Sequence, residues 1–225
     1  MISRDVATEE LSADRLSARD RYRLMTDLVA PRPIAWVSTL SDRGAPNLAP
    51  FSYFQGVCSD PPTIVLGIAW LPDGRPKDTL ANILATRELT ISHVDQSLAP
   101  AMNATSAEFG PEISEWEACG IEPAPAERVA PPRVARALGG LECRLSHAIP
   151  LGRTKLGAPS STLVIAEVVH FWVAEGLLQR DGRGHLLPID PAALQAVGRL
   201  GGIAYAPTTG HFDLPRPTVP GDTPK

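Results

Sequence analysis

Cysteine, positive charge and long apolar runs are all scarce in this sequence. The 225 residues contain three cysteines, Cys58, Cys119 and Cys143, and no two of them have C-x-x-C spacing. That pattern argues against a zinc ribbon or a disulfide framework, so we expect free thiols, no metal and a reducing, cytoplasmic setting. Lysine and arginine number 21 against 25 acidic residues, so the net charge of −4 predicts neither a nucleic-acid partner nor a membrane surface. No run reaches the roughly 20 apolar residues of a membrane helix.

Motifs for nucleotide binding and for nucleophilic catalysis are missing as well. The chain has no G-x-G-x-x-G after a predicted strand, no Walker loop and no H-x-x-x-H. NAD(P)H, if it is used, must therefore bind without a Rossmann domain of its own. The five histidines show no Ser-His-Asp order, and we interpret them as core or surface residues. We assign no catalytic acid, base or nucleophile.

The composition predicts one β-rich domain with many turns. Apolar residues make up 44% of the chain, which is enough for a sizeable core, and the 23 prolines are about twice the usual share. No flexible linker separates two apolar halves. We expect a flexible N-terminal arm over residues 1–16, one domain over 17–215 and a disordered tail over 216–225.

Periodicity and turn residues predict mostly strands. The expected strands cover residues 34–40, 47–58, 63–69, 88–94, 141–149 and 162–173. The expected helices begin after a capping box at Ser17, after an N-cap at Asp78, after Ser114 and near Ala192, the last running to Leu200. Between them, residues 104–136 form a long proline-rich excursion. Strands that close back on themselves favour a barrel over an open parallel sheet.

A series of short blocks along residues 22–217 carries a family pattern. The blocks are PRPIAWVST (31–39), NLAPFSYF (47–54), SDPP (59–62), KDTLANI (77–83), AMNATS (101–106), SEWE (114–117), LEC (141–143), IAEVVH (165–170) and GRLGG (198–202). In this order they closely resemble the flavin reductase-like family. The resemblance implies a mainly β, Greek-key split barrel that binds FMN, with a few short peripheral helices.

The tripeptide Lys77-Asp78-Thr79 is the clearest candidate for an anion site. It lies at a predicted helix N-terminus, where backbone N–H groups and the helix dipole favour a phosphate. Lys77 adds a positive charge and Thr79 a hydroxyl. Taken alone, the tripeptide is better explained as a plain N-cap with a solvated lysine. The resemblance implies instead that it meets the flavin phosphate.

The resemblance also implies further FMN contacts. In the two strands after Pro31, buried hydroxyls and amides need partners, which a planar polar ligand would supply. The further expected contacts are Arg32, Ser38, Thr39, Asn47, Ser52, Tyr53, Phe54, Arg199 and Tyr205. Two alternatives stay open for Arg32, the phosphate and the dimer surface. Cys58 stands where the family is often serine-rich, which leaves the exact ring contacts open.

The favoured interpretation is an FMN-binding oxidoreductase that acts as an NAD(P)H-dependent flavin reductase. FMN would be the cofactor and NAD(P)H a transient donor, with a flavin-dependent monooxygenase as a recipient of reduced flavin. Two alternatives remain: a non-catalytic FMN electron carrier or flavin-binding protein, and an FMN-dependent oxidase or oxygenase of a small organic substrate. We expect a homodimer, with the 104–136 excursion reaching across its interface.

Overall fold

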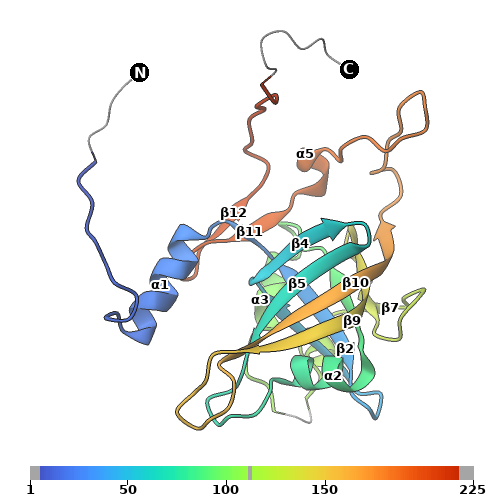
Figure 1. Cartoon of the computed structure of the whole chain (residues 1–225). Helices are drawn as coiled ribbons and strands as arrows, with labels where there is room; N and C mark the ends of the chain where they lie inside the picture. Colours follow the sequence, from blue (N-terminus) through green and yellow to red (C-terminus); the bar gives the residue numbers. More distant parts are fainter. Residues whose placement is uncertain (1–5, 111–112, 218–225) are drawn as a thin grey trace.

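One curled antiparallel sheet forms the body of the protein. In the computed structural model, which describes residues 6–110 and 113–217, seven strands are hydrogen-bonded in the order β3-β2-β6-β9-β10-β5-β4. The strands are β2 (Ala35–Leu40), β3 (Pro46–Phe51), β4 (Phe54–Ser59), β5 (Pro62–Ala69), β6 (Glu88–Ser92), β9 (Gly139–Leu151) and β10 (Ser161–Val173). Figure 1 shows the sheet wound into a barrel, with β3 and β4 as its two unpaired edges.

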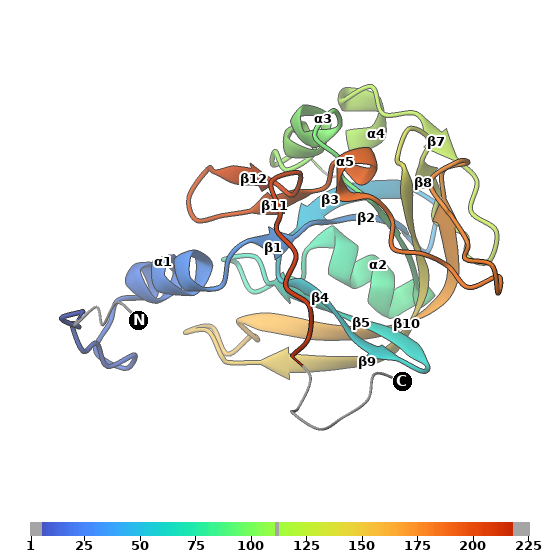
Figure 2. The same ribbon diagram turned by 90° about the horizontal axis from the view of Figure 1, so that it is seen from above.

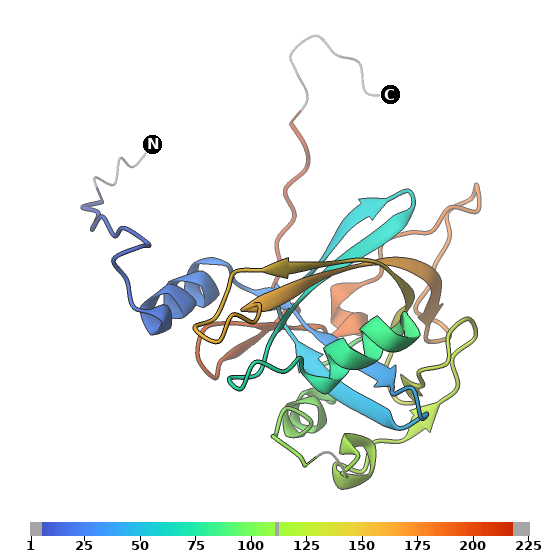
Figure 3. The same ribbon diagram turned by 60° about the horizontal axis from the view of Figure 1, so that its bottom comes forward.

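The barrel interior is filled by side chains that alternate inward along the strands. In β5, Ile64, Leu66 and Ile68 are buried, and they belong to one apolar cluster with residues from the other strands. Helix α2 (Asp78–Thr86) lies across one end of the barrel, as Figure 3 shows. It adds Leu80 and Ile83, both fully buried, and each contributes about 1.5–3 kcal/mol of burial free energy.

A second apolar cluster covers the outer face of β2 and β3. Helices α3 (Ala99–Ala104) and α4 (Glu115–Ala118) lie against this face, followed by the hairpin of β7 (Pro123–Ala124) and β8 (Arg133–Val134) (Figure 2). Trp36 is fully buried there, and its indole N–H donates to Thr105 Oγ1 at 2.9 Å. Helix α4 and the β7–β8 hairpin belong to the predicted 104–136 excursion, and this described part of it packs over the sheet.

Three short strands make a small sheet beside the barrel. They are β1 (Arg32–Pro33), β11 (Val197–Arg199) and β12 (Tyr205–Pro207), with β11 in the middle. The predicted helix over residues 192–200 is therefore wrong beyond its first turn. Helix α5 covers only Pro191–Leu194, because Gln195 takes a left-handed φ of 48° and the next residues pair with β1 and β12.

Two further details correct the sequence interpretation. The predicted strand over 47–58 is two strands, since the chain turns at Ser52 and Tyr53, and the Tyr53 carbonyl accepts from Gly67 N–H at 2.7 Å. That turn carries the chain from one edge of the sheet to the other.

At α2, the N-cap is Lys77 and not Asp78. The Ser17 cap is confirmed: Ser17 Oγ accepts from Asp20 N–H at 3.1 Å.

Both described ends of the chain extend away from the barrel. Helix α1 (Ala18–Leu28) projects to one side and the segment after β12 leaves in another direction (Figure 1). Residues 6–16 contain no helix or strand. The boundaries of the arm and the domain stay predictions. Most of the tail predicted over 216–225 falls on residues 218–225, outside the described part of the chain.

Candidate functional site

The N-terminus of α2 leaves backbone donors open to a ligand. Lys77, the N-cap, is in an extended conformation, with φ −63° and ψ 152°, and no side chain among the described residues caps the first turn. The N–H groups of that turn therefore lack a side-chain acceptor. Lys77 is exposed beside them, so it can supply a positive charge. This donor set suits a phosphate, although Asp78 adds a negative charge to the same turn.

A chain of polar contacts ties this helix end to the sheet. Asn47 Nδ2 donates to Thr79 Oγ1 at 2.9 Å, and Asn82 Nδ2 donates to Thr39 Oγ1 at 3.0 Å. Thr39 pairs with Asn47 across β2 and β3. The structure thus brings Thr39, Asn47 and Thr79 together, and their contacts with FMN stay predictions. Asn82 was missed, although it follows Thr79 by three positions and so shares its helix face.

The edge strand β3 carries a second feature that the sequence analysis missed. Leu48 N–H donates to Glu115 Oε2 of α4 at 3.2 Å. Burial raises the pKa of the Glu115 carboxyl above its usual 4.5, and the nearby charge of Asp78 raises it further. An acidic side chain of the outer layer therefore lies close to the proposed phosphate end. Glu115 falls in a segment of little periodicity, so no local pattern could have identified its role.

A polar cavity of about 240 Å³ lies at the other end of β3. Its walls include four of the predicted residues, Arg32, Ser52, Arg199 and Tyr205. Arg199 donates to the Tyr205 hydroxyl and lies over the Tyr205 ring, 4.5 Å from its centroid. The Tyr205 hydroxyl in turn donates to Asn103 Oδ1 at 3.1 Å. Helix α3 and the small sheet thus share one polar network.

Arg32 has a clear structural role in this cavity wall. It is buried, and its guanidinium donates to the carbonyls of Thr26 at 2.5 Å, Val29 at 2.8 Å and Leu200 at 3.0 Å. These bonds connect the end of α1 to the segment after β11. Arg32 also lies within 3.4 Å of Ser52 Oγ. Any contact with FMN stays a prediction, and its position favours the cavity end over the phosphate end.

The remaining predicted residues lie outside both polar groups. Ser38 faces the side opposite to Thr39, and its hydroxyl is buried without a partner among the described residues. Tyr53 is 44% exposed at the turn between β3 and β4, and burial raises the pKa of its hydroxyl. Phe54 lines a separate, apolar cavity. Their contacts with a flavin stay predictions.

The two polar ends are spaced for an elongated ligand. From Asn47 to Phe51 the strand advances four residues, about 13 Å at 3.3–3.4 Å per residue, and Ser52 follows directly. One end offers uncapped helix amides and a lysine, and the other offers hydroxyls and guanidinium groups around a cavity. FMN has a phosphate at one end and a planar ring with polar edges at the other. The residues present therefore fit this group.

Comparison with known proteins identifies the family. Residues 28–188 match the model of the flavin reductase like domain. The chain belongs to the flavin reductase-like family. An uncharacterized protein of Halalkalibacterium halodurans is 39% identical to this flavin reductase-like protein over 210 residues, covering 93% of this chain and 97% of the relative.

Solved structures agree on the fold of this flavin reductase-like protein. The nitrilotriacetate monooxygenase component B of Bacillus cereus is 34% identical, with a TM-score of 0.85 and coverage of 93% and 100% of the two chains. The 2-nitrobenzoate 2-nitroreductase of Pseudomonas fluorescens is 32% identical, with a TM-score of 0.78 and coverage of 96% and 99%. A protein of Shewanella frigidimarina with a split barrel domain is 24% identical and shares the fold, with a TM-score of 0.75 and coverage of 93% and 100%. The predicted split β-barrel is confirmed.

Two properties of the described residues bear on membrane proteins and metalloproteins. None of the helices over residues 6–110 and 113–217 combines the length and apolarity that crossing a membrane requires. The same part of the flavin reductase-like protein contains no cluster of three or more histidine, cysteine or acidic side chains suited to a metal ion.

Proposed function

We propose that this protein binds FMN along β3 and uses NAD(P)H to reduce flavin. The observation that carries the proposal is the uncapped N-terminus of α2, with Lys77 beside it and Thr79 linked to Asn47 on the edge strand. A site with these donors selects an anionic group at one defined end of the strand. The bound flavin would supply the hydride and electron transfer chemistry.

The protein's residues would bind and orient the cofactor in this proposal. Lys77 and the first-turn amides of α2 hold the phosphate, and the bond from Asn47 to Thr79 fixes the strand against the helix. At the other end, Arg199 and Tyr205 form a fixed polar wall, because each is held by a neighbouring group. Such prearranged donors cost little reorganisation when a ligand arrives.

The proposal also includes NAD(P)H as a transient electron donor and a second protein that receives the reduced flavin. Without a nucleotide-binding motif in the sequence, NAD(P)H would bind weakly and leave after hydride transfer. The relative from Bacillus cereus is named a component of a monooxygenase. We propose by that likeness that a flavin-dependent monooxygenase receives the reduced flavin. The three free cysteines support a reducing compartment, the cytoplasm, as the place of the activity.

A homodimer is part of the proposal and is supported by exposed apolar side chains. In the projecting α1, Tyr22 is 63% and Leu28 is 80% exposed. In the extended segment after β12, Phe212 is 82% and Leu214 is 81% exposed. Apolar side chains gathered on projecting segments are typical of surfaces that a second copy covers. Sedimentation at micromolar concentration tests this part, and a monomer that retains FMN would remove it.

The central test is anaerobic reduction of the loaded protein. The purified protein is titrated with FMN, its visible spectrum is recorded, and NADH and NADPH are added separately. We expect oxidised-flavin bands that one of the two nucleotides bleaches within minutes. A protein that FMN cannot load would refute the site. Bleaching by dithionite alone would leave the site intact and replace the reductase activity with electron carriage.

A further inference from the structure

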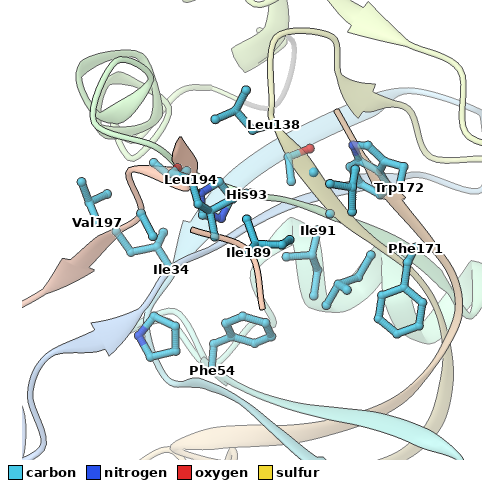
Figure 4. Close-up of a pocket in the computed structure, with 18 residues that line it drawn as sticks. Ile34, Phe54, Ile91, His93, Leu138, Phe171, Trp172, Ile189, Leu194 and Val197 are labelled. Atoms are coloured by element: carbon cyan, nitrogen blue, oxygen red, sulfur yellow. The ribbon is translucent and has the colours of Figure 1, made fainter. Parts of the chain in front are cut away.

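An apolar cavity of about 320 Å³ is lined by residues at the end of β6, the start of β9 and the end of β10. Figure 4 shows side chains converging on it from several elements, with Phe54 on one side, Phe171 and Trp172 on another and Ile189 between them. The segment before α5 supplies Ile189 and so forms part of its wall. The volume is at the lower end of the range of about 300–1,000 Å³ typical of small-molecule sites.

Close packing around a glycine shapes one wall of this cavity. A Cβ at Gly140 would come within 2.3 Å of the Trp172 ring and 2.2 Å of the Ile91 carbonyl oxygen. Glycine at this position therefore lets the indole ring lie directly over the strand. The rings of Phe54, Phe171 and Trp172 together give the cavity aromatic walls on more than one side. Such faces favour a flat, apolar ligand.

The cavity offers almost no polar side-chain atom. Among its lining residues, only Ser92, His93 and Trp172 carry a polar side-chain atom, and the Trp172 indole N–H can only donate. The Ser92 hydroxyl accepts from Val134 N–H at 3.0 Å, so it is already engaged with β8. A charged ligand would lose its hydration here without a counter-charge, which is costly. Nucleotides and other phosphates are therefore poor candidates for this cavity.

His93 supplies the available acceptor among these side chains. Its Nε2 lies 3.2 Å from the Leu194 carbonyl oxygen, an acceptor, so Nε2 carries the proton. Burial lowers the pKa of His93, which keeps the ring neutral near pH 7. In that tautomer Nδ1 is an acceptor, and no residue of the described chain donates to it.

We propose that this cavity binds a small, uncharged aromatic molecule with one hydrogen-bond donor, which His93 Nδ1 accepts. The aromatic body would pack among Phe54, Phe171 and Trp172. Ile34 lines this cavity and also the polar cavity at the end of β3, so the two sites adjoin. The proposal does not rest on flavin binding, because every group that it uses belongs to the apolar cavity.

The test uses calorimetry on the flavin-free, full-length protein with two matched probes. 4-Propylphenol has one donor, whereas its methyl ether, 4-propylanisole, has the same ring and tail without the donor. We expect one phenol to bind per chain, with a Kd on the order of 0.1 mM. The ether should bind about two- to tenfold more weakly, which is the loss of one neutral hydrogen bond.

Three variants test whether the phenol binds in the cavity and whether it donates to His93. Ile189→Trp should fill the cavity and weaken phenol binding at least tenfold. Leu187→Trp is the matched control, because Leu187 is two residues away, 42% exposed and not part of the cavity wall. His93→Phe should bring the two probes to equal affinity. Melting temperatures of all variants report whether each still folds.

Each of three outcomes would overturn the proposal. One is no phenol binding up to about 1 mM in the wild-type protein, a tenfold excess over the expected Kd. Another is equal binding by Ile189→Trp and Leu187→Trp. The last is binding that appears only after the residues beyond Pro207 are deleted, which would identify the chain's own end as the occupant. None of these results affects the FMN titration, so the two proposals fail independently.

Discussion

Replacing Lys77 by alanine should change ligand binding and folding stability in opposite directions. A charge-assisted contact with a phosphate contributes about 1.5–3 kcal/mol, so FMN affinity should fall about ten- to a hundredfold. Without a ligand, a positive charge at a helix N-terminus is unfavourable, because the helix dipole is positive at that end. Lys77 is exposed at the N-cap of α2 and forms no ion pair with a side chain of the described residues.

The stability of the flavin-free protein should therefore stay the same or rise slightly on Lys77→Ala. The dipole effect at an exposed site is about 0.3 kcal/mol, which corresponds to roughly 1 °C in melting temperature for a chain of this size. In excess FMN the order should reverse, since the stabilisation of the folded state by a ligand grows with the logarithm of the ligand concentration divided by its Kd. A lysine with only a structural role would not give this reversal.

Fluorescence titration of FMN gives the Kd, and thermal melts with and without FMN give the stabilities. Lys155→Ala is the matched control, because Lys155 is an exposed lysine outside both candidate polar groups. The loss of affinity should shrink at high salt, where exposed charges are screened. An unchanged Kd for Lys77→Ala at low salt would mean that the anion site lies elsewhere.

Further predictions concern the other charged and thiol groups. Burial and the charge of Asp78 raise the pKa of Glu115. As the pH rises through that pKa, the carboxylate becomes negatively charged and repels the FMN phosphate, so FMN affinity should fall. The Glu115→Gln variant should show a flatter dependence of FMN affinity on pH in titrations. Arg32→Met should lower stability by roughly 3 kcal/mol in urea unfolding, since three carbonyls lose their donor, and a loss under 1 kcal/mol would contradict the contacts described. Burial raises the pKa of Cys143, so a thiol reagent should modify exposed Cys58 in the native protein and Cys143 only after unfolding, as mass spectrometry can report.

The long strands and α2 could be predicted from the sequence because their signals are local. β5 and β10 alternate apolar side chains with a period of two, and their observed bounds differ from the predicted ones by one residue at most. The helix predicted over 192–200 failed for a non-local reason. Its second half pairs with β1, more than 160 residues earlier, and no local propensity reports such a partner.

In the candidate site, too, local features could be predicted from the sequence and long-range contacts could not. For Lys77 and Thr79, a helix N-terminus is a local feature that favours anions, but only the family resemblance implied the flavin phosphate, and that contact stays a prediction. The contacts of Arg32 could not be predicted, because one of its acceptors, the Leu200 carbonyl, is 168 residues away in the sequence. Glu115 and His93 were missed for the same reason. Each takes its role from a residue on another element, Leu48 and Leu194 respectively.

The edge strand β3 explains why a split barrel can keep one side open for a ligand. N–H groups along a strand point alternately to its two sides, and Leu48 N–H points away from β2 to reach Glu115. Pro46 and Pro50 occupy the neighbouring positions on that side, and proline has no N–H to offer. An added strand would therefore find few donors here, which protects the edge from pairing with another chain. The outward carbonyls remain as acceptors, and the polar groups at both strand ends fix where a ligand can lie. In the proposed FMN site, these carbonyls would accept from a ligand that brings its own donors, as the imide N–H of a flavin ring does.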